Sequence, residues 1–271
     1  MLRRTSIIIA AITVCAGAAV AGGMAASASS PTAQANPGGT INIVSVHTGT
    51  AGAPTQVLSS NWSGYAATTG RFTSVSSSWT QPAVSCNFGN QWSSYWVGLD
   101  GFNSGTVEQT GSEADCVGRT AHYFAWYEMF PAFPVNFSDP VAPGDQFNAS
   151  VQFLGGDLFS LHIADSTQEW SHTVEAHLGT TPALSSAEVI VEAPCCFGGG
   201  ALKPTAFNVL SLANFGTVSL TGATANGEPI GSEGFTPNEI NMVGSIIPRT
   251  KATCSGLTEG TDFACTWVRS F

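Results

Sequence analysis

Charged residues are scarce in this chain, and basic residues are the scarcest. Only 10% of the 271 residues are charged, and 18 Asp and Glu stand against 8 Lys and Arg, which gives a formal net charge of −10. A nucleic-acid-binding protein needs a basic stripe that so few basic residues cannot build. A coiled coil needs many more charges, and intrinsic disorder needs low hydrophobicity, whereas 43% of this chain is hydrophobic. These three classes are therefore excluded.

Long hydrophobic segments are also lacking after the N-terminus. Met1-Leu2-Arg3-Arg4 precedes an apolar run from Ser6 to about Val20, and Ala26-Ser27-Ala28 is a candidate cleavage site. This combination is typical of a secretory signal peptide and predicts one over residues 1–28. The run is short for a membrane anchor, and no later segment reaches about 18 apolar residues. We therefore expect a secreted, extracellular protein that does not contact the membrane once the signal is removed.

Signal removal makes the shortage of positive charge more pronounced. It removes Arg3 and Arg4 and takes the formal net charge to −12, with six basic residues and five histidines remaining. When the carboxylates are protonated in acid, so few positive charges repel one another only modestly. The composition therefore favours a protein that stays compact at low pH.

The cysteine count fits an exported protein. Cys15 belongs to the predicted signal, and the six cysteines that remain are Cys86, Cys116, Cys195, Cys196, Cys254 and Cys265. An even number in a secreted chain predicts disulfides. Cys254 and Cys265 flank a turn that contains glycine, so we expect them to pair, with Cys86 and Cys116 as a second pair. Cys195 and Cys196 are adjacent and cannot easily bond to each other. The spacing of zinc sites is absent, so no metal and no cofactor is expected.

The sequence after Asn61 has the pattern of strands and turns. Short runs of aromatic, β-branched and Thr residues are broken by Gly, Pro, Asn and Asp. The predicted strands include Phe72–Thr80, Ser94–Leu99, His122–Phe130, Phe147–Leu154, Leu158–Ile163, Ser171–His177, Ala187–Glu192, Thr217–Leu220, Glu239–Val243 and Ala264–Val268. Gly155-Gly156-Asp157 and Asn226-Gly227 are hairpin-turn signals. No convincing helix and no internal repeat is found.

This pattern predicts one large all-β domain over residues 58–271, a β-sandwich. Residues 29–57 are rich in Ser, Pro, Thr, Ala and Gly and read as a flexible leader or a short pro-segment. Within that leader, Ile41–Val46 is a candidate edge strand. We expect the protein to be a monomer.

Several common catalytic signatures are missing. The sequence has no Gly-x-Ser-x-Gly elbow, no His-Glu-x-x-His motif and no Asp-Thr-Gly or Asp-Ser-Gly motif. Carboxylates and amides beside aromatic residues remain. Glu188 and Glu192 are separated by an even number and share one face of a strand. From this spacing alone, a solvent-exposed pair is the simpler interpretation.

Seven motifs, taken in order, resemble the glutamic peptidases, also called the eqolisin family. They are Ser60-Asn61-Trp62-Ser63-Gly64-Tyr65, Trp79-Thr80-Gln81-Pro82, Trp96-Val97-Gly98-Leu99-Asp100-Gly101, Glu108-Gln109-Thr110-Gly111, Ala125-Trp126-Tyr127-Glu128, Ala187-Glu188-Val189-Ile190-Val191-Glu192 and Ala213-Asn214-Phe215-Gly216. The resemblance extends over roughly residues 59–268. After the sixth motif the chain reads Ala193-Pro194-Cys195-Cys196, where fungal members have an acidic and aromatic stretch. This departure concerns the subsite preferences near Glu192 and not the mechanism. The resemblance is to a secreted member of bacterial type.

The resemblance implies a concanavalin-like β-sandwich of two large antiparallel sheets with a groove on a concave face. It also implies an endopeptidase that cleaves proteins or peptides in acid. The catalytic pair it implies is Gln109, from the Gln-Thr-Gly motif, and Glu192, the last residue of its motif. The substrate-binding residues it implies are Trp62, Trp96, Asp100 and Glu128, with Asp100 also helping to order its region.

These residue types suit peptide hydrolysis. A carboxylate such as Glu192 can take a proton from water and return it to the leaving amine. An amide such as Gln109 can orient the water and donate a hydrogen bond to the oxyanion.

Two other functional classes remain open from the sequence. A carbohydrate-binding or lectin-like module would use Trp62, Trp92, Trp96 and Trp126 as a stacking platform. A glycosidase would need two positioned carboxylates, for which Glu188 and Glu192 are candidates without a supporting motif. A catalytically inactive family member is a third possibility.

Overall fold

The described part of the chain consists of strands joined by turns and loops. A computed structural model describes residues 35–36, 39–47, 54–87, 89–197 and 209–271, and the predicted signal peptide lies outside these ranges. The elements within these ranges are all strands. Accordingly, the described residues include no helix with the length and apolar character needed to cross a membrane.

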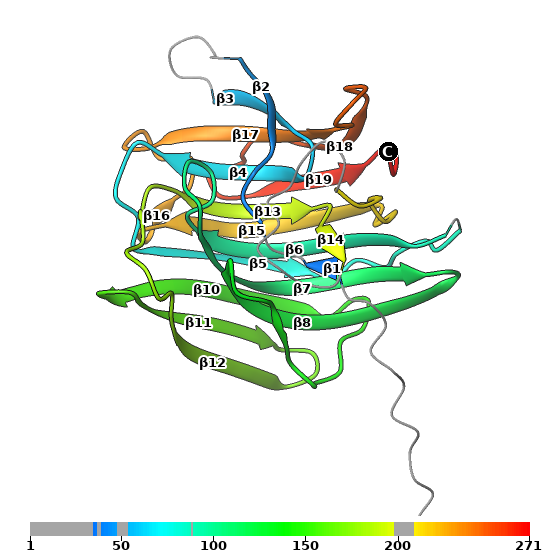
Figure 1. The fold of residues 1–271 in the computed structure, drawn as a ribbon, viewed down its shortest axis with the longest axis horizontal. Coiled ribbons are helices and arrows are strands. Elements are labelled where there is room, and N and C mark those ends of the chain that lie inside the picture. The colour runs from blue at the N-terminus through cyan, green and yellow to red at the C-terminus, as the bar shows by residue number, and fades with distance from the viewer. Residues whose placement is uncertain (1–34, 37–38, 48–53, 88, 198–208) are drawn as a thin grey trace, which may run out of the picture. The chain divides into compact units, whose positions relative to one another are not determined.

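The first layer carries the predicted catalytic residues. Neighbouring strands in this layer follow the order β2 (Ile43–His47), β3 (Thr55–Ser59), β17 (Thr236–Val243), β4 (Trp62–Thr68), β13 (Ala187–Glu192), β6 (Gln91–Leu99), β7 (Val107–Val117), β8 (Thr120–Phe130) and β9 (Val135–Asn136). All of these neighbours are antiparallel except β3 and β17, which are parallel. Figure 1 shows β4, β13, β6 and β7 side by side in the centre of this layer.

The second layer is joined to the first where the last residues of β17 pair with β18 (Thr250–Cys254). The layer then runs through β19 (Phe263–Trp267), β15 (Thr217–Ala225), β5 (Ser74–Thr80), β10 (Gln146–Gly155), β11 (Leu158–Asp165) and β12 (Trp170–His177), with the short β16 (Glu228–Pro229) beside β15. A separate pair joins β1 (Ala35–Asn36) to β14 (Cys195–Phe197). The chain therefore forms the expected all-β sandwich.

The main hydrophobic core lies between the two layers. In β11 the side chains alternate, and Phe159, Leu161 and Ile163 are buried while their neighbours are partly exposed. They join the same buried cluster as Val97 and Val189 of the first layer. Each fully buried side chain of this kind contributes about 1.5–3 kcal/mol to stability. The alternation has a period of two because successive side chains of a strand point to opposite faces of the sheet.

The central strands of the first layer are buried on both faces. Every residue of β4, β6 and β13 is buried. One face packs on the main core, and the opposite face carries a second apolar cluster that includes Trp62, Trp96, Trp126, Phe130 and Ile190. We call this second face, formed by β4, β13, β6, β7 and β8, the site face.

Both predicted disulfides are confirmed. Cys86 is bonded to Cys116, and Cys254 is bonded to Cys265. The second of these links the paired strands β18 and β19, whose register places the two cysteines opposite each other. Cys195 lies in β14 and is buried.

The two predicted hairpin turns are also present. Gly155 and Gly156 have positive φ between β10 and β11, and Asn226 and Gly227 have positive φ between β15 and β16. The strand predicted as Thr217–Leu220 continues to Ala225, because β15 pairs with β5 on both sides of a register shift. Within the predicted leader, residues 43–47 form β2 and residues 55–57 begin β3.

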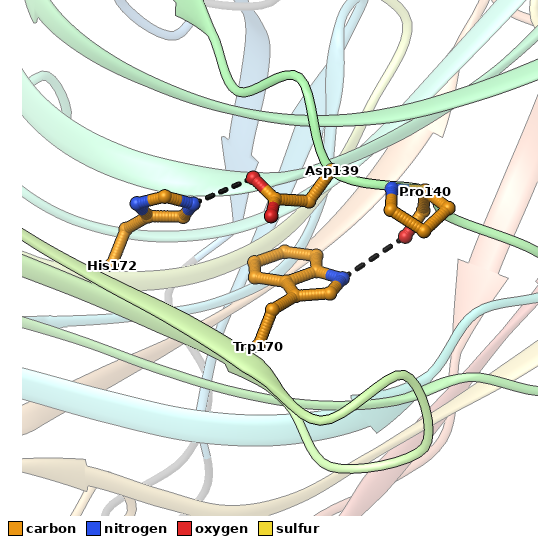
Figure 2. A network of polar contacts seen from close by, with 4 residues as sticks. All are labelled: Asp139, Pro140, Trp170 and His172. Atoms are coloured by element: carbon orange, nitrogen blue, oxygen red, sulfur yellow. Dashed lines mark hydrogen bonds and ion pairs between the residues drawn. The ribbon is translucent and has the colours of Figure 1, made fainter. Parts of the chain in front are cut away.

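A polar network fastens the loop after β9 to β12. Figure 2 shows the His172 ring pointing at Asp139, with 2.7 Å between Nε2 and Oδ2, and the Trp170 indole N–H donating to the Pro140 carbonyl at 3.0 Å. Phe137 stacks on His172 with 4.3 Å between ring centroids. Because β9 is the edge strand beside β8, this network supports the edge of the first layer.

We expect His172→Ala to destabilise the fold by about 1 kcal/mol, since it removes a partly exposed hydrogen bond and a ring contact. Thermal unfolding monitored by circular dichroism measures the effect. His122→Ala, at an exposed position without such contacts in the described residues, is the control and should leave the melting temperature within about a degree. Equal melting temperatures for the two variants would show that the network does not support the edge.

Candidate active site

The strand register places the predicted catalytic residues on one face. Gln109 of β7 lies opposite Glu128 of β8 on one side and opposite Gly98 of β6 on the other. Gly98 in turn lies opposite Glu188 of β13. Glu192 is four residues further along β13 and therefore has the same orientation as Glu188. Gln109, Glu128, Glu188 and Glu192 all project from the site face.

Glu192 is held by two nitrogen donors. The Trp96 indole N–H donates to Oε2 at 2.8 Å, and the Asn61 amide donates to Oε1 at 3.4 Å. The Trp62 ring packs edge-on against Trp96, with 5.0 Å between centroids. Glu192 is completely buried. The predicted groove aromatics thus fix the orientation of the predicted catalytic carboxyl.

Burial raises the pKa of Glu192 well above its usual value. The charge of Glu128 raises this pKa further, while the hydrogen bonds from Trp96 and Asn61 oppose the shift by favouring the ionised form. Glu192 therefore retains a proton to a higher pH than an ordinary glutamate. Such a carboxyl is suited to exchanging protons with a reacting group in acid.

Gln109 keeps one hydrogen-bonding atom open. Its Nε2 donates to Oε2 of Glu128 at 2.8 Å. Its Oε1 is buried and has no hydrogen-bond partner in the described part of the chain. A buried polar atom without a partner is costly, so this oxygen is available to accept a hydrogen bond from a water or a ligand.

Two glycines leave room for these side chains. A Cβ on Gly111 would lie 2.2 Å from the carbonyl oxygen of Tyr95 and 2.6 Å from the Cβ of Trp96. A Cβ on Gly98 would lie 2.9 Å from the Trp96 ring and 3.2 Å from the Cβ of Gln109. Both glycines belong to the motifs that carried the family resemblance, and the close approach of Trp96 and Gln109 explains why glycine is needed there.

Asp100 secures the segment that leads into β13. Oδ2 accepts the Leu184 main-chain N–H at 2.7 Å, and Oδ1 accepts the Ser185 main-chain N–H at 2.8 Å and its hydroxyl at 3.0 Å. Asp100 itself has a positive φ of 68°, a conformation that Asp tolerates better than most residues. The geometry therefore gives Asp100 the ordering role expected for it, with both carboxylate oxygens already occupied.

The solvent-exposed interpretation of Glu188 and Glu192 was wrong, because both residues are completely buried. Neither carboxyl oxygen of Glu188 has a hydrogen-bond partner among the described residues. Burial, followed by the charges of Asp100 and Glu108, raises the pKa of Glu188 well above its usual value. Even spacing identified the shared face but could not show that this face is covered.

Sequence reasoning missed two residues of the site. Asn61 was part of a quoted motif without a role, yet it contacts Glu192 directly. Glu113 is completely buried on β7, and its pKa is raised by burial, by Asp115 and by the charges of Glu192 and Glu128. Glu113 follows Gln109 by four residues, so the strand period placed it on the same face.

The four tryptophans of the carbohydrate-binding hypothesis do not form an open platform. Trp62, Trp96 and Trp126 are completely buried, and Trp92 is 6% exposed.

A cavity of about 430 Å³ lined by Arg249, Lys251 and their neighbours contains none of the predicted site residues. Among the described residues, no three His, Cys, Asp or Glu side chains are placed to hold a metal ion.

The chain is similar in sequence and in fold to peptidases. The model of the peptidase A4 family matches residues 60–267. Aspergillopepsin-2 from Aspergillus niger is 27% identical over 232 residues, which cover 76% of this chain and 79% of that protein. The structure of scytalido-glutamic peptidase with a transition state analog inhibitor superposes with a TM-score of 0.64 at 23% identity, covering 77% of this chain and 98% of that chain. SCP-B, a member of the eqolisin family in complex with the tripeptide Ala-Ile-His, gives a TM-score of 0.60 at 23% identity with the same coverage.

Proposed function

The chain belongs to the peptidase A4 family and is a glutamic endopeptidase; from this premise we propose that Glu192 and Gln109 form its catalytic pair and act in acid. One observation carries the proposal. Glu192 is a buried carboxyl fixed by the Trp96 indole, on the same face as Gln109, whose Oε1 has no partner within the described ranges.

Glu192 supplies the proton transfers. Its carboxylate takes a proton from the attacking water as the water adds to the peptide carbonyl carbon, and it returns that proton to the leaving amine. The Trp96 and Asn61 donors hold the carboxyl in one orientation throughout. Because burial raises the pKa of Glu192, this carboxyl is mostly protonated in acid. Only its ionised fraction can take the proton from the water, whereas the protonated form readily donates to the leaving amine.

Gln109 orients the water and stabilises the oxyanion. Its open Oε1 accepts a hydrogen bond from the water. Its amide nitrogen has two protons, and Glu128 accepts one of them at 2.8 Å. The second proton remains for the oxyanion that forms on the substrate carbonyl. Glu128 is in this account the residue that fixes the Gln109 amide, while Trp62 and Trp96 line the substrate path.

The proposal extends to where and on what the enzyme acts. Signal-like residues 1–28 and the two disulfides fit secretion. The relatives include structures bound to a peptide-based transition state analog and to a tripeptide, which supports peptide or protein substrates for this chain. We also propose that the protein is a monomer. We propose that it is a family member of bacterial type, because Ala193-Pro194-Cys195-Cys196 stands where fungal members have an acidic and aromatic stretch.

The test is cleavage of a denatured protein at pH 3–4 by wild type and by Gln109→Ala. Loss of one oxyanion donor is expected to lower kcat about 10²–10³-fold. Gln81→Ala, another buried glutamine that lies outside the site face on the loop after β5, is the matched control and should retain activity within about threefold.

Equal activity of Gln109→Ala and wild type would remove Gln109 from the catalytic pair. No cleavage by wild type anywhere between pH 2 and pH 7 would identify an inactive member. Polysaccharide binding by such an inactive protein would restore the lectin hypothesis.

A further inference from the structure

The segment just before β2 lies close to the Glu192 carboxyl. Gly39 and Thr40 are buried, and Ile41 packs against the apolar cluster that contains Trp62 and Trp96. The Thr40 carbonyl accepts a hydrogen bond at 3.3 Å from the Asn61 amide that also donates to Glu192. We call residues 39–47, which include β2, the strap.

The strap is held through its main chain in the manner of an extended peptide. On one side, the Asn61 amide nitrogen donates to the Thr40 carbonyl and the Asn61 amide oxygen accepts the Asn42 N–H at 2.8 Å. On the other side, the Ile41 N–H donates to the Gly101 carbonyl at 3.2 Å. Bonds that alternate between two sides of successive residues are the pattern of a strand between two neighbours. None of these bonds requires a particular side chain on the bound segment.

The turn before β4 secures the end of this stretch. The Ser60 N–H donates to the Asn42 carbonyl at 3.0 Å, and the Asn42 amide donates to the Ser60 hydroxyl at 2.8 Å. Beyond it, β2 pairs with β3, and Figure 1 shows β2 running across the direction of β17 and β4. The strap lies before residues 60–267, the part that matches the family model, so it is an addition to the matched domain.

We propose that Asn61 and the Gly101 carbonyl are the docking points for the main chain of a peptide substrate. The strap occupies these points until a substrate displaces it or it is cut from the chain. The inference rests on the proposed function of Glu192 and Gln109, because it places a peptide beside Glu192. Asn61 acts as a positioning residue that binds the substrate main chain and the catalytic carboxyl with one amide.

The attachment of the strap is electrically neutral. Residues 39–46 carry no ionisable side chain, so main-chain bonds, amides and the Ile41 contact hold the strap. A substrate must therefore displace the strap by offering the same main-chain groups, or the chain between the strap and β3 must be cut.

A cleavable protein tests this inference. A recognition sequence for a site-specific protease replaces residues 48–53, between β2 and β3, and activity on a denatured protein is measured before and after the cut and removal of the released segment. We expect activity to rise at least about tenfold.

A synthetic peptide of residues 35–47, added to the cut protein, should inhibit competitively. The same peptide with Ile41→Ser should inhibit about tenfold less well. The same peptide with Val44→Ser, at a position 40% exposed on the strap, is the matched control.

A second measurement does not depend on catalysis. Binding of the 35–47 peptide to the cut protein carrying Glu192→Gln is followed by calorimetry and tryptophan fluorescence, with and without Asn61→Ala. We expect Asn61→Ala to weaken binding at least about tenfold, since it removes two main-chain hydrogen bonds. Binding unchanged by Asn61→Ala, or activity unchanged by removal of the strap, would overturn the proposal. A protein that binds the peptide through Asn61 but never hydrolyses a substrate would retain the docking site and refute the proposed function alone.

Discussion

Replacing Glu192 by glutamine is expected to lower kcat for peptide hydrolysis about 10³–10⁴-fold, with a much smaller change in KM. Glutamine has nearly the same shape and still offers an oxygen to the Trp96 indole N–H, which donates to Glu192 at 2.8 Å. The variant therefore keeps the packing of the site face and removes only the group that can accept and return a proton. Initial rates on a fluorogenic peptide across pH 2–7 measure the loss.

Glu188→Gln is the matched control for this experiment. Glu188 shares the strand, the face and the complete burial of Glu192, and burial also raises its pKa. It lacks the nitrogen donors that orient Glu192, and it lies opposite Gly98 of β6, whereas Glu192 lies opposite Ser94. We expect Glu188→Gln to keep kcat within about tenfold of wild type. A large loss in Glu188→Gln with full activity in Glu192→Gln would reverse the assignment of the two carboxyls.

The second layer was predicted from the sequence more successfully than the first. In β11 buried side chains alternate with partly exposed ones, and in β12 partly exposed side chains alternate with exposed ones. Both strands are runs of aromatic and β-branched residues bounded by turn residues, which marked them as strands in the sequence. In β6 every residue is buried, including Ser93 and Ser94, because a strand in the middle of the first layer is covered on both sides. The local sequence pattern does not show whether a distant segment buries a strand. Polar residues such as Ser93 and Ser94 therefore have the sequence pattern of solvent-exposed positions.

The candidate site shows the same limit. The motifs identified Gln109 and Glu192, and even spacing on β13 gave Glu188 and Glu192 a shared direction. That Gln109 projects from the same face follows from the register of β7, β6 and β13. The contact between Asn61 and Glu192 joins residues 131 positions apart, and the strap reaches Asn61 from about 20 positions before it. Contacts at this separation are set by the sheet register and by tertiary packing, which no local pattern encodes.

The thermal stability of the protein is expected to fall as the pH rises from about 4.5 to about 8. Burial, with a contribution from the charge of Asp100, raises the pKa of Glu108 from 4.5 to about 8. Burial also raises the pKa values of Glu113, Asp115 and Glu188. These carboxyls remain protonated in the folded protein over a range in which the unfolded chain has already lost their protons.

The sign of the effect follows from the proton count. Between the unfolded pKa of Glu108 and about pH 8, the folded state binds more protons than the unfolded state, so the free energy of unfolding decreases with rising pH. Each such group contributes up to about 1.4 kcal/mol per pH unit. Below about pH 4 both states are protonated and the dependence ends. Asp157 and Asp262, whose pKa values are lowered by local hydrogen bonds, act in the opposite sense, but they lie at the surface.

Melting temperatures between pH 3 and pH 8 test this expectation, measured on Glu192→Gln so that self-digestion does not interfere. We expect the highest value at or below about pH 4.5 and a loss of stability of at least about 5 kcal/mol by pH 8, which is the amount that the shift of Glu108 alone would contribute. Adding Glu108→Gln to this variant should reduce the slope between pH 4.5 and pH 8, because an amide cannot ionise in the unfolded chain. A melting temperature that rises over this range would show that the buried carboxyls are ionised and paired in the folded protein. The expected profile, highest in acid, would instead match the low content of basic residues, since protonated buried carboxyls and few positive charges both favour the compact state where Glu192 is proposed to act.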